Sequence, residues 1–244
     1  MRKYLILGSL FFAVVVCASI PAFVLLEPCH SLSVIPTSTK ERADAALSAE
    51  QSNKQNYKNL ILYNGTSGVI VCVGDSITKG NADPDNWPYQ LGALLKVKVI
   101  NQGANGETTR NMLDRINNAT APRPEYVIIA GGINDLNALV PASIIESNIA
   151  TMCQRVQSQH SAPVLCTVTP ETIPHFQRPD ALNAWIKNYA IEHKYPLIDF
   201  YSVVDSNRTY LSSDGIHPSS AGYTAMANAA AKVLTANETE TKRR

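Results

Sequence analysis

Cysteine is scarce in this sequence, with 5 residues in 244, and no two of them form a Cys-x-x-Cys pair or stand at another metal-ligand spacing. An excess of charge of one sign is also absent, because the formal net charge is only +1, and so the chain lacks the basic footprint of nucleic-acid binding. We therefore expect no nucleic-acid partner, and no metal or organic cofactor is called for. The cysteines are Cys17, Cys29, Cys72, Cys153 and Cys166.

Long apolar runs are absent except at the N-terminus, where Arg2 and Lys3 precede a run from Tyr4 to Leu26. As a helix rising about 1.5 Å per residue, this run is long enough to cross a bilayer core. It predicts either a signal peptide, cleaved near Val16-Cys17-Ala18, or a retained anchor with the N-terminus in the cytoplasm. In both cases residues 1–30 carry the rest of the chain out of the cytoplasm, to the periplasm or the exterior.

Polar residues dominate the next segment, residues 31–58, which has almost no large apolar side chain and is typical of a linker. We expect the folded domain to run from residue 59 to 235, followed by a polar tail at 236–244. The length suits one domain with appendages better than two domains.

Short apolar runs alternate with helical patterns inside the expected domain. Strands are predicted at 69–73, 97–101, 126–130, 164–168 and 196–199. Helices are predicted at 87–95, 108–116, 142–159, 181–193 and 219–234. Short, β-branched runs that are apolar on both faces are typical of buried parallel strands. The pattern predicts an α/β domain with a parallel five-stranded sheet covered on both faces, but it does not give the strand order.

The first predicted strand ends in Gly74-Asp75-Ser76. In open α/β sheets, ligands bind at the carboxyl ends of the strands, so this turn is a candidate site. We expect Gly74 to supply conformational freedom for the turn, and Ser76 is a candidate nucleophile. The turn could also be no more than a helix N-cap, and the functional interpretation therefore depends on partners for Ser76.

Two other loops follow predicted strands. The loop after the second strand contains Gly103 and Gly106, and Gly106 would present its N–H just before a helix. A phosphate-binding loop would end in Gly-Lys-Ser/Thr, which is absent. After the third strand, Asn134 offers a side-chain amide to the same crevice. For the neighbouring Asp135, an Asx turn that caps the next segment is a competing interpretation.

A serine nucleophile needs a base, and the base must itself be oriented by an acceptor. His30 lies beside the predicted membrane segment, and among the other histidines only His217 has an acidic residue, Asp214, three positions before it. A carboxylate at that spacing in a tight turn can bind the ring and fix its tautomer. The sequence thus predicts that Ser76, His217 and Asp214 act together and that activity falls on acidification, since the base must be neutral.

These residues form four blocks in the sequence: Gly74-Asp75-Ser76-Ile77, Gly106, Gly132-Ile133-Asn134-Asp135 and Asp214-Gly215-Ile216-His217. Together and in this order they resemble the conserved blocks of the SGNH, or GDSL, hydrolase superfamily. More loosely, Trp87 and Leu91 resemble its bacterial lysophospholipase and arylesterase branch. The resemblance implies a three-layer α/β/α, flavodoxin-like fold and hydrolysis of carboxylic esters. The Gly-x-Ser-x-Gly elbow of α/β-hydrolases is absent.

The same resemblance implies the role of each residue. Ser76 is the nucleophile, His217 the base and Asp214 the residue that orients the base. The oxyanion hole consists of the backbone N–H groups of Ser76 and Gly106 and the side-chain amide of Asn134. The implied reaction is acyl transfer through an acyl-enzyme, which water then hydrolyses.

The sequence leaves the substrate and the oligomeric state open. The loops at 136–141 and 169–179 are placed to wall a pocket. Their apolar residues could line an acyl slot or pack into the core: Leu136, Leu139, Val140, Ile173 and Phe176. The expected substrates are lysophospholipid, aryl or short acyl esters. The alternatives are a carbohydrate O-acetyl esterase and a catalytically silent, membrane-tethered binding module.

Overall fold

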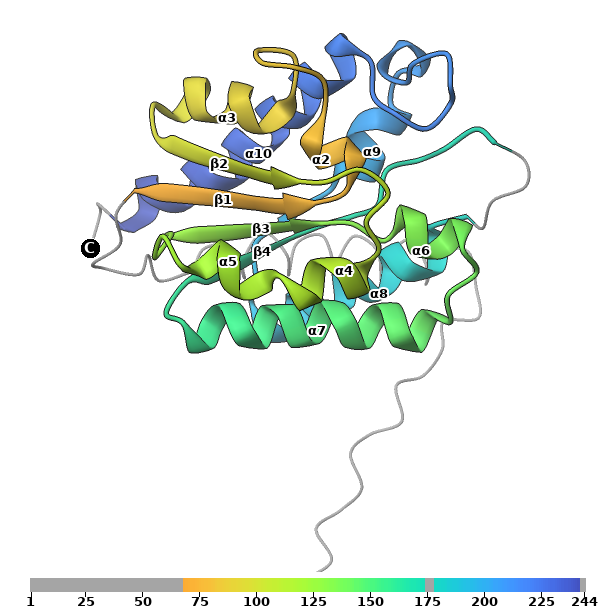
Figure 1. Ribbon diagram of the computed structural model, residues 1–244. Helices are drawn as coiled ribbons and strands as arrows, with labels where there is room; N and C mark the ends of the chain where they lie inside the picture. The colour runs from red at the N-terminus through yellow and green to blue at the C-terminus, as the bar shows by residue number, and fades with distance from the viewer. Residues whose placement is uncertain (1–67, 174–177, 242–244) are drawn as a thin grey trace, which may run out of the picture.

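The structure is a computed structural model that describes residues 68–173 and 178–241, with side chains as far as residue 235. A five-stranded parallel sheet lies between two layers of helices (Figure 1), which confirms the predicted α/β/α architecture. The predicted signal or anchor at 1–30, the predicted linker at 31–58 and Phe176 lie outside the described residues. Within the described ranges, no helix is both long and apolar enough to span a membrane.

The strands pair in the order β2-β1-β3-β4-β5, and all neighbours are parallel. Their bounds are β1 Val69–Gly74, β2 Lys98–Gly103, β3 Tyr126–Ala130, β4 Ala162–Cys166 and β5 Leu197–Ile198. Strands β1, β3 and β4 are buried on both faces, which is why their sequences show apolar runs without alternation. The edge strand β2 is partly exposed. Cys72 and Cys166 are buried free thiols in β1 and β4.

Helices cover both faces of the sheet (Figure 1). On one face lie α2 Ser76–Lys79, α3 Trp87–Leu95, α9 Phe200–Asp205 and α10 Ser220–Thr241. On the other lie α4 Thr109–Asp114, α5 Ile116–Thr120, α6 Ile133–Asn137, α7 Ala142–Ser158 and α8 Asp180–His193. A short 3-10 helix, η1, spans Arg208–Tyr210. Helix α3 and strand β3 have the predicted bounds, and most other predicted elements differ only at their ends.

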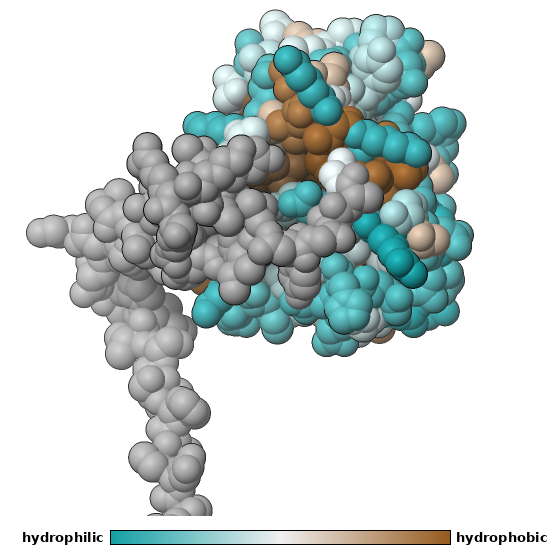
Figure 2. Space-filling view, turned by 90° about the vertical axis from the view of Figure 1, so that its left-hand side faces the viewer, coloured by the Kyte–Doolittle hydropathy of each residue, from teal (hydrophilic) through white to brown (hydrophobic). Residues whose placement is uncertain are grey.

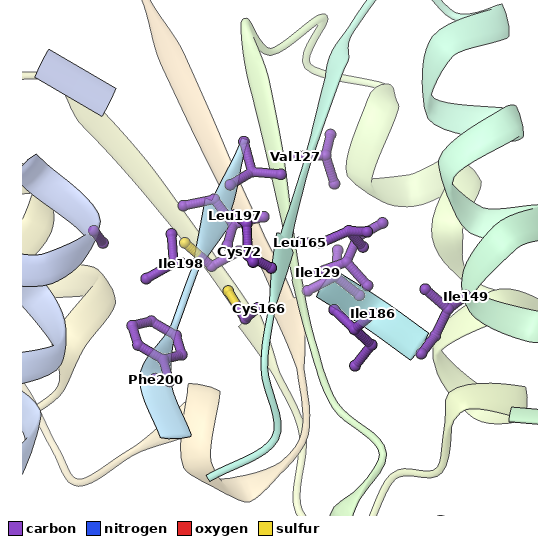
Figure 3. Packing of buried hydrophobic residues seen from close by; sticks show 14 of the residues in the cluster. Cys72, Val127, Ile129, Ile149, Leu165, Cys166, Ile186, Leu197, Ile198 and Phe200 are labelled. Carbon is purple, nitrogen blue, oxygen red and sulfur yellow. The ribbon is translucent and has the colours of Figure 1, made fainter. Parts of the chain in front are cut away.

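The core fills the two spaces between the sheet and its helices. Figure 3 shows Ile129, Ile149 and Ile186 packed on the side of α7 and α8, whereas Ile198 and Phe200 lie on the opposite side of the sheet. On that second side the fully buried ring of Trp87 meets Phe200 edge to face, with ring centroids 5.2 Å apart. Burial of each such side chain contributes about 1.5–3 kcal/mol, so this contact fixes α3 and α9 on the sheet.

The amino ends of the strands form the opposite end of the molecule from the turns that carry the candidate site. Figure 2 shows that face, on which an apolar area is bordered by polar side chains above and on the right.

Two local predictions need correction. The predicted helix at 108–116 is two helices, α4 and α5, because the backbone of Arg115 leaves helical geometry at φ −111° and ψ 6°. Gly74 does not supply an unusual backbone conformation, since it continues strand β1. A Cβ on Gly74 would lie 2.1 Å from Thr78 Oγ1 and 2.4 Å from the Ala130 carbonyl oxygen, so glycine is required there for space.

Candidate active site

Three of the predicted blocks lie in loops that follow the neighbouring strands β1, β2 and β3, and these strands end next to one another at the same edge of the sheet. Gly74, at the end of β1, pairs with Gly103 of β2 on one side and with Ala130 of β3 on the other. The chain runs from β1 outward to β2 and then crosses back to β3, so the strand order reverses around β1. In α/β sheets a crevice opens at such a reversal, and the segments that contain Ser76, Gly106 and Asn134 all start there.

Ser76 is the first residue of the short helix α2, directly after strand β1. Asp75 caps this helix, because its Oδ1 accepts a hydrogen bond of 2.9 Å from the Ile77 N–H. The α2 backbone packs against the end of β2 so closely that a Cβ on Gly103 would lie 2.0 Å from Lys79 N. The position of Ser76 is therefore fixed by a cap at one end of α2 and a backbone contact at the other.

The fourth block is held in a tight turn before α10. An antiparallel bridge joins Leu211 to Pro218, and the Ser212 N–H donates to the His217 carbonyl oxygen at 2.8 Å. Gly215 adopts φ +72°, a conformation that favours glycine. Its carbonyl oxygen accepts from the Thr172 N–H at 2.9 Å, so the loop after β4 supports this turn.

A chain of short contacts links three of the predicted site residues. His217 Nε2 lies 2.9 Å from Ser76 Oγ, and His217 Nδ1 lies 2.7 Å from Asp214 Oδ2. Because an ionised carboxylate can only accept, Nδ1 carries the proton that faces Asp214. Nε2 is then the acceptor for the Ser76 hydroxyl, which is the arrangement a general base requires.

Asp214 is held as a carboxylate by its own turn. Burial acts to raise its pKa, but hydrogen bonds from the N–H groups of Ile216 and His217, from the Ser212 hydroxyl and from the His217 ring outweigh it and hold the pKa well below the ordinary range. The Ile216 and His217 N–H groups both donate to Oδ1 at 2.9 Å. The second oxygen, Oδ2, stays in place to accept from the ring.

The structure brings Asn134 to the loop of Gly106. Asn134 Nδ2 donates to the Glu107 carbonyl oxygen at 2.9 Å, and a primary amide has a second N–H for another partner. Gly106 is exposed and adopts φ +72°. Its neighbour Asn105 lines the same hollow as Ser76 and His217.

Asp135 has a role that the sequence did not reveal. It lies within α6, is 1% exposed, and accepts hydrogen bonds from the Thr109 N–H at 2.8 Å and from Thr109 Oγ1 at 2.7 Å. Thr109 Oγ1 also accepts from Asn148 Nδ2 at 3.0 Å. The interpretation of Asp135 as an Asx-turn cap is therefore wrong, because its carboxylate ties α6 to the start of α4.

Asp75 is a second buried carboxyl group next to the site, with 2% of its surface exposed. Burial raises its pKa to about 6, although the N–H groups of Ile77 and Thr78 and the charge of His217 favour the ionised form. No sequence pattern distinguishes such a residue from an ordinary exposed N-cap.

Ser76 and His217 open onto a hollow of about 520 Å³. Its lining is mainly polar and consists, besides these two, of Gly80, Asn81, Asn105, Ser212, Asp214, Pro218, Ser219, Ser220 and Tyr223. Of the predicted acyl-slot residues that the structure describes, none lines it: Leu136 is buried in the core and Leu139 is 65% exposed. Among the described residues, no group of three or more His, Cys, Asp or Glu side chains is placed to hold a metal ion.

Comparison with known families gives a match to the GDSL-like Lipase/Acylhydrolase family over residues 72–225, which is well over half of the chain. The chain belongs to this family. The family consists of lipases and acylhydrolases, and the chain is accordingly an ester hydrolase. A search of curated proteins gave no match.

Solved structures of the GDSL family have the same fold. A protein described as a G-D-S-L family lipolytic protein, from Desulfitobacterium hafniense DCB-2, is 28% identical over 69% of this chain and 100% of its own, with a TM-score of 0.64. A lipase/acylhydrolase from Enterococcus faecalis is 24% identical over 70% and 96%, with a TM-score of 0.64. A catalytic mutant of an acetylxylan esterase from Geobacillus stearothermophilus is 22% identical over 70% and 95%, with a TM-score of 0.61. At these last two identities the likeness concerns the fold alone.

Proposed function

We propose that this GDSL hydrolase is a serine esterase that cleaves carboxylic esters through an acyl-enzyme on Ser76. The observation that carries the proposal is the continuous chain of contacts from Ser76 Oγ to His217 Nε2 and from His217 Nδ1 to Asp214 Oδ2. Such a chain turns a weak nucleophile into a reactive one, because the base is both within reach and held in the required tautomer.

In the first step, His217 removes the proton of Ser76 as Oγ attacks the ester carbonyl carbon. The imidazolium that forms is stabilised by Asp214, whose carboxylate is already held by its turn. His217 then donates this proton to the leaving alcohol, and the acyl group remains on Ser76. In the second step, His217 activates a water molecule that attacks the acyl-enzyme, which releases the acid and restores the Ser76 hydroxyl.

Both steps pass through a tetrahedral intermediate whose oxyanion needs donors. The Ser76 and Gly106 N–H groups and the Asn134 amide are the donors we propose, since they follow the adjacent strands β1, β2 and β3. Removal of one such donor typically lowers turnover by about 10²- to 10³-fold. We accordingly expect Asn134→Ala to fold and to lose about that much activity.

The lining of the hollow favours a substrate with a polar alcohol portion. Asn81, Asn105, Ser212 and Ser219 line the hollow onto which Ser76 opens, and among the described residues its lining offers no apolar slot for a long acyl chain. This observation favours the second candidate, a carbohydrate O-acetyl esterase, over a lysophospholipid esterase. A panel of esters with acyl chains from two to twelve carbons separates them, because a polar site should prefer acetyl groups.

The experiment that tests the proposal compares the parent protein with Ser76→Ala on p-nitrophenyl acetate. We expect the variant to lose nearly all turnover and to retain the thermal unfolding midpoint of the parent. Equal rates in the two proteins would refute the assignment of Ser76. A parent protein that neither turns over any ester in the panel nor reacts with a fluorophosphonate would indicate the silent, membrane-tethered binding module instead.

We also propose an extracytoplasmic location, in the periplasm or outside the cell, supported by the apolar run from Tyr4 to Leu26 behind Arg2 and Lys3. N-terminal sequencing of the protein recovered from expressing cells distinguishes a cleaved signal from a retained anchor. Recovery of the full-length chain in the soluble cytoplasmic fraction would contradict both.

A further inference from the structure

We propose that Arg115 is a positioning residue that keeps the three oxyanion donors in the correct positions relative to one another. This inference rests on the proposed function of Ser76. Arg115 lies at the break between α4 and α5. Its side chain is 22% exposed and makes an ion pair with Glu107, which is 19% exposed. Neither residue belongs to the four sequence blocks that contain Ser76, Gly106, Asn134 and His217.

The guanidinium group joins two of the three loops of the site. Arg115 Nη2 donates to the Gly74 carbonyl oxygen at 3.1 Å, at the strand end that leads into Ser76. Arg115 Nε lies 2.9 Å and 2.8 Å from the two carboxylate oxygens of Glu107, and Nη2 also contacts Glu107 Oε2. The planar fork of arginine can reach a carboxylate and a carbonyl at once, which a lysine ammonium does less well.

Glu107 extends the connection to the third loop. Its backbone carbonyl oxygen accepts from Asn134 Nδ2 at 2.9 Å, and it directly follows Gly106 in the chain. A single cation is thus linked to the segments that carry all three proposed donors: through Gly74 to Ser76, through Glu107 to Gly106, and through the Glu107 carbonyl to Asn134.

This geometry matters for rate more than for binding. Oxyanion donors act on charge that develops in the transition state, so their displacement lowers kcat and leaves KM nearly unchanged. A shift of about 1 Å in a positioned group can lower the rate by about 10²-fold. The Gly74 carbonyl oxygen also accepts from the Ala104 N–H at 3.0 Å. This hydrogen bond remains when Arg115 is replaced, so the protein should still fold.

The test uses Arg115→Gln and Arg115→Lys in the full chain, with p-nitrophenyl acetate as substrate. Arg110→Gln is the matched control, because Arg110 lies in α4, five residues before Arg115, is 69% exposed and pairs with the exposed Asp114. We expect Arg115→Gln to lower kcat by about 10- to 100-fold with KM within about twofold of the parent, and Arg115→Lys to recover only part of the loss. Arg110→Gln should keep the parental kcat.

A double-mutant cycle checks that Arg115 acts through Glu107. The variant with both Arg115→Gln and Glu107→Gln should be no slower than the slower single variant, because both changes break the same link. Parental kcat in folded Arg115→Gln and Arg115→Lys would overturn the inference, and so would additive losses in the cycle. If Ser76→Ala, measured in parallel, kept the parental rate, the proposed function itself would fail instead.

Discussion

Asp75→Asn isolates the effect of one buried charge on stability. Asp75 is 2% exposed, and its Oδ1 accepts from the Ile77 N–H at the start of α2. Asparagine is about as good an N-cap as aspartate and can make the same bond through its amide oxygen. The substitution therefore keeps the cap and removes only the ionisation.

The magnitude follows from the pKa. Burial raises the pKa of Asp75 from 3.8 to about 6, a shift of about two units, and each unit corresponds to about 1.4 kcal/mol. Between these two pKa values the folded state binds a proton that the unfolded state does not, so stability falls as the pH rises. Asp75 should therefore contribute about 3 kcal/mol of stability below pH 4 that is absent above pH 6.

Urea unfolding of the parent and of Asp75→Asn, at pH 4 and at pH 7, measures this contribution. We expect the parent to lose about 2 kcal/mol more of its free energy of unfolding between pH 4 and pH 7 than the variant does, because at pH 4 this residue is already partly ionised in the unfolded state. The comparison cancels the titration of other groups, because these are common to both proteins. If the two proteins showed the same pH dependence, the reasoning from the burial of Asp75 would be refuted.

Three further substitutions test the contacts that position the site residues. Asp135→Ala leaves the Thr109 N–H and hydroxyl without their buried acceptor, and we expect a loss of about 3 kcal/mol by urea unfolding, whereas a loss below about 1 kcal/mol would contradict it. Gly103→Ala places a Cβ 2.0 Å from Lys79 N, which should lower stability by about 1–3 kcal/mol and also slow ester hydrolysis; an unchanged melting temperature would show that α2 can move. Asp214→Asn should fold normally and lose about 10³- to 10⁴-fold in turnover, and a loss below tenfold would show that the ring of His217 does not need this acceptor.

The fold was largely predictable because its strands and long helices carry strong periodic signals. Strand β3 is five apolar residues with turns at both ends, and helix α7 shows apolar residues at helical spacing. The strand order was not predictable, because every central strand is equally apolar and nothing local marks its neighbour. The short helices α6 and α9 were missed, and α2 was expected only as an alternative, through an N-cap at the turn before Ser76. Each has six residues or fewer, too few to show an amphipathic period.

The site residues were predictable where they belong to a motif of residues close together in the sequence. They were not predictable where their roles depend on residues far away in the sequence. Asp214 and His217 stand three positions apart in one turn, and the structure places both in line with Ser76. By contrast, the role of Asp135 depends on its hydrogen bonds with Thr109, and the role of Arg115 depends on its hydrogen bond to the Gly74 carbonyl oxygen. These contacts exist only in the folded chain. The space requirement at Gly74 is partly of the same kind, since one of the atoms that a Cβ there would meet is the Ala130 carbonyl oxygen of the neighbouring strand β3.

The central claim is that Ser76 is the residue that attacks the ester. Mass spectrometry of the protein treated with a fluorophosphonate tests it most directly, because the reagent forms a stable adduct with an activated serine. We predict one adduct per chain, located on Ser76 and absent from His217→Ala, which folds but lacks the base. An adduct on another serine, or undiminished labelling of Ser76 in His217→Ala, would contradict the account.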